Sequence, residues 1–172
     1  MKVILFAFAI LAAFVQADLD FTPRDGITVE DYILMVKGLL EGLNIKQDMN
    51  KIIQCIDHVP AAVHVLIEAI KKIKNLDIHN ILQIVEAIIQ TIGALREIVD
   101  DILPCAESSE ELKKLIDKFT HIDFDKIFQQ LLMKLIKIVP EIMDAKKAID
   151  EKRWEDFGKK VGKSIYILLL ED

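Results

Sequence analysis

Side chains that act as nucleophiles or metal ligands are scarce in this sequence. Its 172 residues include three serines, two cysteines and four histidines. The serines occur in neither Gly-x-Ser-x-Gly nor Ser-x-x-Lys, and the His-Glu-x-x-His motif and glycine-rich phosphate loops are absent. The carboxylate pairs Asp100-Asp101 and Glu110-Glu111 are most simply solvated charges at predicted helix ends. We therefore expect a protein that is not an enzyme and that needs no cofactor.

Basic residues are too few and too dispersed for a polyanion-binding surface. The chain has 22 lysines and arginines against 28 aspartates and glutamates, a formal net charge of −6. The lysines stand singly or in pairs between apolar residues, whereas binding to a phosphate backbone requires a concentrated basic stripe. Anionic membrane surfaces attract polybasic segments in the same way. The sequence thus argues against nucleic acid and strongly anionic membranes as partners.

The N-terminus carries an unbroken apolar run from Val3 to Val15, preceded by Lys2. The small-x-small sequence Val15-Gln16-Ala17 follows, and the combination is typical of a secretory signal peptide. The alternative, a membrane anchor, needs about 20 apolar residues, and this run ends at Gln16. We expect residues 1–17 to be cleaved and residues 18–172 to form a single helical domain without a transmembrane segment. The protein is then secreted or resident in the lumen of the secretory pathway.

Cysteine is limited to Cys55 and Cys105, which leaves one possible pairing. A disulfide between them is the expected state in an oxidising secretory compartment. This disulfide would close a loop of about 50 residues, which stabilises a fold by about 4 kcal/mol in the chain-entropy model. Two buried free thiols are the alternative. Neither cysteine belongs to a recognisable Cys-His catalytic signature.

Apolar residues recur at helical spacing along almost all of the remaining chain, and strand-type alternation is not sustained. The sequence therefore predicts an all-α fold, a compact multi-helix bundle. Thr28 and Ser108 each begin a capping-box pattern, and Pro60 suits a first helical position. The expected helices span residues 28–42, 46–57, 60–73, 77–103, 108–119 and 123–139, the last ended by Pro140, with C-terminal helices over residues 140–172.

Two short stretches, Leu76-Asp77-Ile78 and Ile122-Asp123-Phe124, are near copies. A shift of 46 residues superimposes them, and a shift of 50 carries Cys55 onto Cys105. The repeat predicts a duplicated αα-hairpin over about residues 55–103 and 105–139. We expect Asp77 and Asp123 to be helix N-caps, each worth about 1 kcal/mol. The alternative, a metal site that adds His79 and His121, is disfavoured because the histidines occupy different places in the repeat.

The predicted core is heavily aliphatic, and the chain has one tryptophan. Such a core can be dry, can part to hold an acyl chain or sterol, or can present an apolar face to lipid or to a partner. Gly158 and Gly162 are expected to form a close helix crossing. If a ligand is held, the candidate lining is Ile81, Val85, Ile88, Ile127, Leu131 and Leu135.

Taken together, several of these features resemble small secreted helical proteins of ciliates. They are the signal peptide, "KGLLEGL" in the first helix, two cysteines about fifty residues apart, aspartate-opened helices and the late "FGKKVGK". The resemblance implies no catalytic residue. The chain departs from saposin-like lipid binders, which use more cysteines in a shorter chain.

The leading hypothesis is a secreted, non-enzymatic protein that binds a lipid or another hydrophobic small molecule in its aliphatic core. The alternative is a structural or interaction protein of the secretory or granule pathway. The pattern of residues favours neither a particular ligand nor a particular oligomeric state.

Overall fold

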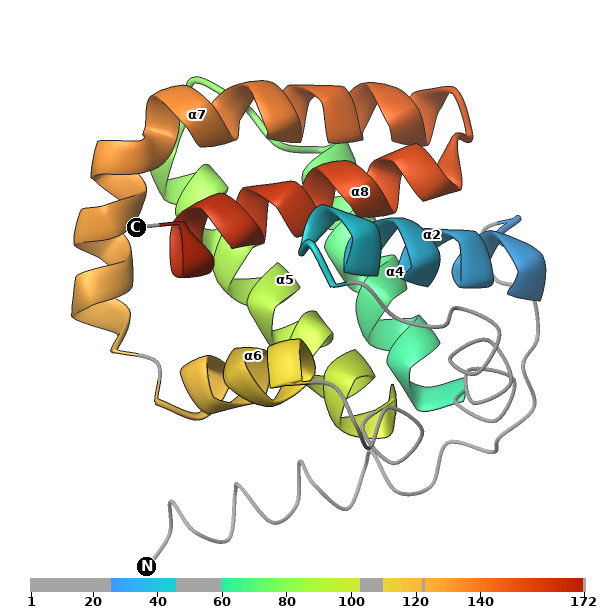
Figure 1. Ribbon diagram of the computed structural model, residues 1–172. Helices are drawn as coiled ribbons and strands as arrows, with labels where there is room; N and C mark the ends of the chain where they lie inside the picture. The colour runs from blue at the N-terminus through green and yellow to red at the C-terminus, as the bar shows by residue number, and fades with distance from the viewer. Residues whose placement is uncertain (1–25, 46–59, 103–109, 122, 172) are drawn as a thin grey trace, which may run out of the picture.

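The regular structure of the protein is helical (Figure 1). The computed structural model describes residues 26–45, 60–102, 110–121 and 123–171, and these residues contain no β-strand. The predicted all-α fold is thus confirmed. Buried apolar side chains from every described helix join one core, and none of these helices combines the length and apolar character needed to cross a membrane. The predictions for residues 1–17 and 46–57, for Cys55 and Cys105 and for the Ser108 cap lie outside the described residues.

Helix α2 (Val29–Gly42) begins where the sequence predicts a cap. The Thr28 side chain accepts a hydrogen bond from the backbone N–H of Asp31 at 3.1 Å. The Asp31 carboxylate in turn accepts one from the N–H of Thr28 at 2.9 Å. This capping box satisfies two backbone donors that lack helical partners. Past the other end of the helix, Asn44 has a φ of 59°, a left-handed conformation that asparagine tolerates better than most residues.

Helix α8 (Trp154–Ile165) lies against α2 at a distance that only glycine allows. A Cβ atom added to Gly158 would lie 2.0 Å from the Met35 carbonyl oxygen, and one added to Gly38 would lie 1.9 Å from that of Glu155. The second glycine of each pair, at positions 42 and 162, is nearly as tight. The expected crossing at Gly158 and Gly162 is therefore present, and a matching pair on α2 completes it. We call these four residues the glycine seam: Gly38, Gly42, Gly158 and Gly162.

Helices α4 (Pro60–Lys74) and α5 (Ile81–Ile102) pack against each other. The helix expected to open at Asp77 begins four residues later, so Asp77 is not its N-cap. The Asp77 carboxylate accepts a hydrogen bond from the N–H of His79 at 2.9 Å, within the turn. Asn80 caps α5, because its side chain accepts from the N–H of Gln83 at 3.3 Å. The side chains of Asp77 and Asn80 both accept hydrogen bonds from nearby backbone N–H groups. Asn80, which directly precedes α5, is the one that caps the helix.

Helices α6 (Glu110–Thr120) and α7 (Phe124–Asp150) are joined by a shorter turn. Here Asp123 is the N-cap of α7, and its carboxylate accepts from the N–H groups of Asp125 at 3.1 Å and Lys126 at 3.3 Å. Asp77 and Asp123 thus make the same bond to the residue two positions on, but only Asp123 opens a helix. Packing also differs, since α4 packs on α5 whereas α7 packs mainly on α8 and the C-terminal segment. The likeness of the two predicted hairpins is local to their turns.

Pro140 does not end α7, contrary to the prediction. The helix continues to Asp150 with Pro140 inside it, and Figure 1 shows a bend between the first part of α7 and the part that crosses the top of the view. A proline inside a helix lacks one N–H and costs about 3 kcal/mol. The second half of α7 buries Ile142, Ala145 and Ile149, and the burial of this apolar surface outweighs the local cost.

The C-terminal segment extends α8 as a short, wider helical turn, η2 (Tyr166–Leu170), which packs on α7. Ile167 and Leu168 are buried, so this segment docks on the core. Carbonyl groups at the end of a helix lack helical partners. Here two lysines donate hydrogen bonds to such carbonyl groups. Lys134 Nζ donates to the Ile167 carbonyl oxygen at 2.7 Å, and Lys118 Nζ donates to the Leu169 carbonyl oxygen at 2.9 Å.

The helices form two layers that cross each other (Figure 1). In the first layer, α8 lies between α2 and the second half of α7. In the second layer, α4 and α5 lie together behind it in this view, with α6 against α5. The layers meet where α4 contacts α7 and α5 contacts α8. The candidate site lies at this junction.

Candidate functional site

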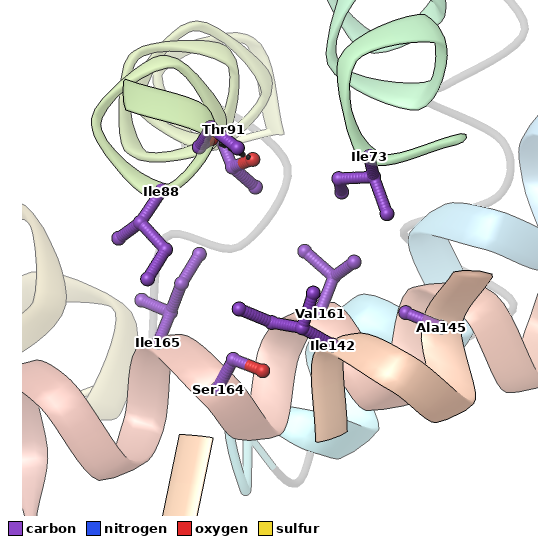
Figure 2. Close-up of a pocket in the computed structure, with 9 residues that line it drawn as sticks. Ile73, Ile88, Thr91, Ile142, Ala145, Val161, Ser164 and Ile165 are labelled. Atoms are coloured by element: carbon purple, nitrogen blue, oxygen red, sulfur yellow. Dashed lines mark hydrogen bonds between the residues drawn. The ribbon is translucent and has the colours of Figure 1, made fainter. Parts of the chain in front are cut away.

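An apolar cavity lies where the two layers meet. Figure 2 shows side chains of α4, α5, α7 and α8 around a shared space. Its walls are almost entirely hydrocarbon. The lining residues are Ile73 of α4, Ala87, Ile88 and Thr91 of α5, Ile142 and Ala145 of α7, and Val161, Ser164 and Ile165 of α8.

Small side chains keep this space open. Ala87, Ala145 and Ser164 stand in the wall where larger residues would close the gap, since protein interiors otherwise fill to the density of organic crystals. Ala87 and Thr91 are one turn apart on α5. The same face of this helix therefore presents a small side chain, which leaves space, and a hydroxyl group. The surrounding branched aliphatic residues keep the walls apolar.

Two hydroxyls are the polar side-chain groups that the described residues contribute to the wall. Thr91 Oγ1 donates to the Ala87 carbonyl oxygen at 2.6 Å, and Ser164 Oγ donates to that of Lys160 at 2.9 Å. Both side chains belong to buried residues. A hydroxyl has one proton and two lone pairs. Because each proton is engaged within its own helix, each hydroxyl offers the cavity a hydrogen-bond acceptor.

The cavity is small as it stands. Its volume is about 20 Å³, which is room for one or two water molecules. Pockets for drug-sized ligands have volumes of about 300–1,000 Å³. An acyl chain can therefore enter only when the two layers move apart.

Lysines at the edges of the described structure hold the layers together. Lys146 Nζ of α7 donates to the Leu76 carbonyl oxygen in the turn before α5, at 2.9 Å. The bond from Lys118 of α6 to Leu169 spans the layers at another edge. Between these edges the contact is aliphatic, and such surfaces separate without breaking hydrogen bonds. At the cavity the contact of α4 and α5 with α7 and α8 is therefore largely apolar, and the bonds from Lys146 and Lys118 stand beside it.

An ion cluster joins α7 to α8 beside the cavity wall. Glu141, which is 8% exposed, accepts a hydrogen bond from Lys163 at 2.5 Å and lies 3.1 Å from Lys160, which also donates to Asp144 at 2.6 Å. Burial raises the pKa of Glu141, but hydrogen bonding and the charges of the two lysines outweigh it, so this pKa lies below its ordinary value. The hydrogen bond from Lys160 likewise lowers the pKa of Asp144. The two lysines thus face carboxylates of α7 and do not line the cavity.

The six residues predicted from the sequence to line a ligand site lie in different places. Only Ile88 is in the cavity wall. The second half of α7 and α8, which the prediction left out, supply five of the nine wall residues. The sequence feature that could have indicated the cavity was the presence of small residues, such as Ala145 and Ser164, on helix faces that point to the core. The other predicted residues are Ile127 and Leu131, which are buried elsewhere, Val85 and Leu135, which are half-buried, and Ile81, which is 47% exposed.

The two aspartate turns do not come together into a site. The turn before α5 lies at the top of the view in Figure 1, and the turn before α7 lies at the lower left. In the part of the chain that the structure describes, no three or more His, Cys, Asp or Glu side chains are grouped to hold a metal ion. His121 Nδ1 contacts its own helix, 3.0 Å from the Asp117 carbonyl oxygen. Asp77 and Asp123 act locally.

A second apolar surface lies outside the core, on the first half of α7. We call it the α7 face, and it comprises Phe128, Leu132, Met133 and Ile136, which are 41%, 44%, 74% and 89% exposed. Three of these residues repeat every four positions, so they share one side of the helix. Two lysines beside this face are paired, since Lys126 lies 3.7 Å from Asp123 and Lys137 lies 3.1 Å from Glu171. Contiguous apolar surface of this kind commonly marks a contact site.

Comparisons of the chain with protein-family models, with curated proteins and with solved structures find no match. Function is therefore argued from the cavity and from the α7 face.

Proposed function

We propose that this is a secreted, non-enzymatic helical protein that binds a lipid or another hydrophobic molecule between its two helical layers. The observation that carries the proposal is the aliphatic cavity at the junction of α4, α5, α7 and α8. It lies where the two layers meet through apolar side chains, and the bonds from Lys146 and Lys118 stand at the edges of this contact.

The energetics of this junction suit a hydrophobic ligand. Separating the layers exposes aliphatic side chains to water, and an inserted acyl chain covers them again. Each CH₂ group that leaves water contributes about 0.8 kcal/mol. The hydroxyls of Thr91 and Ser164 are bonded to their own helices, which favours a role in binding over one in catalysis.

Mass spectrometry of lipid extracted from the purified protein tests the proposal. We expect a hydrophobic molecule at about one per chain. Ala145→Val adds two methyl groups to the cavity wall and should lower the affinity for a neutral lipid by about tenfold, because overpacking costs about 1–3 kcal/mol.

Ala94→Val is the matched control, since Ala94 is a buried alanine of α5 outside the cavity wall. Its substitution should change stability and leave the affinity of the folded protein as it was. Absence of extractable lipid, together with no binding of added lipid, would contradict the proposed function.

Secretion and oxidation state have their own tests. Protein recovered from the medium of a eukaryotic host should begin at Asp18 when its N-terminus is sequenced. A thiol-reactive label should react with Cys55 and Cys105 only after reduction. Retention of Met1 in the recovered protein would contradict secretion through a cleaved signal peptide.

A structural or interaction protein of the secretory or granule pathway is the second candidate, and the α7 face favours it. A second copy of this chain is the partner that we propose for this face. Lys126 and Lys137 beside it are paired with carboxylates, so these lysine charges add little repulsion when two such faces meet. Sedimentation should then show concentration-dependent dimers.

Ile136→Glu should abolish those dimers, because it places a charge in the centre of the contact. Gln90→Glu, which adds the same charge to an exposed position of α5, away from this face, is the control. Monomers at every concentration would contradict this second candidate.

A further inference from the structure

We infer that the molecule held between the layers is a neutral lipid with a hydroxyl group, such as a long-chain alcohol, and not a fatty-acid anion. This inference rests on the proposed function and adds the chemical class of the ligand. It follows from which polar groups face the cavity and from what those groups can still bond.

The hydroxyls of the wall are committed as donors. The short bonds from Thr91 to Ala87 and from Ser164 to Lys160 use the single proton of each group. Each oxygen keeps a lone pair that can accept one more bond. A ligand hydroxyl donates such a bond, whereas a carboxylate or an ester has no proton to donate.

Positive charge is directed away from the cavity. The ammonium groups of Lys160 and Lys163 on α8 bind Glu141 and Asp144 of α7. Lys146 donates to the Leu76 carbonyl oxygen. No ammonium or guanidinium group is among the described residues of the wall. A carboxylate placed there would lose its water without gaining a cation or a donor, which is strongly unfavourable.

Two polar oxygens among aliphatic side chains therefore select a ligand by its head group. In the inferred complex the alkyl chain lies against the branched residues of the wall, and the hydroxyl bonds to Thr91 on one layer or to Ser164 on the other. Figure 2 shows these two side chains on different helices around the pocket. Chain length is set by how far the layers open, and head-group chemistry is set by these two acceptors.

Calorimetric titration of the full purified chain with three ten-carbon probes tests the inference. The probes are 1-decanol, methyl decanoate and sodium decanoate at pH 8. We expect decanol to bind more than about tenfold more tightly than decanoate, because burial of an unpaired charge is costly. The double variant Thr91→Val, Ser164→Ala should weaken decanol binding about fivefold and leave methyl decanoate binding unchanged.

Thr120→Val is the matched control. The Thr120 hydroxyl makes the same bond to its own helix, to the Ile116 carbonyl oxygen at 2.9 Å, but on the exposed surface of α6. Thr91→Ser keeps the acceptor and should retain decanol binding, so a loss caused by misfolding is distinguished from loss of the bond.

Three outcomes decide the question. Selective loss of decanol binding in the double variant supports the inference. Binding of decanoate as tightly as decanol, or equal loss for decanol and methyl decanoate, overturns the inference while the proposed function stands. Failure of all three probes to bind the unsubstituted chain overturns both.

Discussion

Replacing Gly158 by alanine tests the tight packing of α8 against α2. A Cβ atom at this position would lie 2.0 Å from the Met35 carbonyl oxygen and 2.9 Å from the Leu39 nitrogen. Ordinary contacts of a Cβ atom begin at 3.4 Å, so the nearest contact is about 1.4 Å too short. The obstacle is the backbone of α2, which no side-chain rotation can move. Helix α2 must shift away from α8 to admit the methyl group.

The expected loss of stability follows from two opposed effects. Overpacking a tight interior contact costs about 1–3 kcal/mol, and a backbone obstacle belongs at the upper end of this range. The higher helix propensity of alanine offsets about 1 kcal/mol of this loss of stability. We expect Gly158→Ala to lower the free energy of unfolding by about 2 kcal/mol. For a chain of 172 residues this lowers the melting temperature by about 4–8 °C.

Urea denaturation followed by circular dichroism measures this difference, with Gly93→Ala as the matched control. Gly93 lies inside α5, where an added Cβ atom would meet nothing within 4 Å. That variant has the higher helix propensity of alanine without the steric clash, so its free energy of unfolding should rise by about 0.5–1 kcal/mol. If Gly158→Ala were as stable as Gly93→Ala, the reasoning that places α2 against α8 through the glycine seam would be refuted.

Asp123→Ala and Asn80→Ala should each lower the free energy of unfolding by about 1 kcal/mol, because each removes a helix N-cap. Asp77→Ala removes only a turn contact and should cost less; a larger loss than for Asn80→Ala in urea denaturation would contradict this assignment of the α5 cap. The lowered pKa of Glu141 means that its ionised form stabilises the fold above the ordinary glutamate pKa, and that this stability is lost as pH falls through the lowered value. Glu141→Gln should therefore flatten the fall of unfolding free energy at acid pH, and an unchanged slope would count against the ion cluster. Lys146→Met should speed amide hydrogen exchange at the start of α5, since it removes the bond to the Leu76 carbonyl oxygen; unchanged exchange would show that this bond does not hold the layers.

Features that depend on neighbouring residues were predictable from the sequence. The Thr28 cap, the start of α4 at Pro60 and the Asp123 cap each rest on residues within one helical turn. The start of α5 was placed too early because Asp77 and Asn80 can both make capping bonds, and composition does not rank them. Pro140 was read as a helix end because its local cost is known, whereas the packing that outweighs this cost involves another helix.

The cavity was less predictable than the helices around it. Ile88 was identified because the apolar stripe of α5 points inward. Ala87, Ala145 and Ser164 were missed, since small residues on a helix are compatible with a tight contact as well as with a gap. The glycine seam and the cavity show both outcomes within one molecule. Which of them occurs depends on the distance and angle at which two helices cross.

Helical periodicity and hydrogen bonding within a turn are short-range properties, so the amino-acid sequence sufficed to predict the class of fold and the caps at Thr28 and Asp123. Three features depend on how the helices pack: Gly38 and Gly42 meet Gly158 and Gly162, α7 continues past Pro140, and a gap remains beside Thr91. Periodicity states which side of a helix avoids water. It does not state which other helix covers that side or how closely, and the space available to a ligand depends on both.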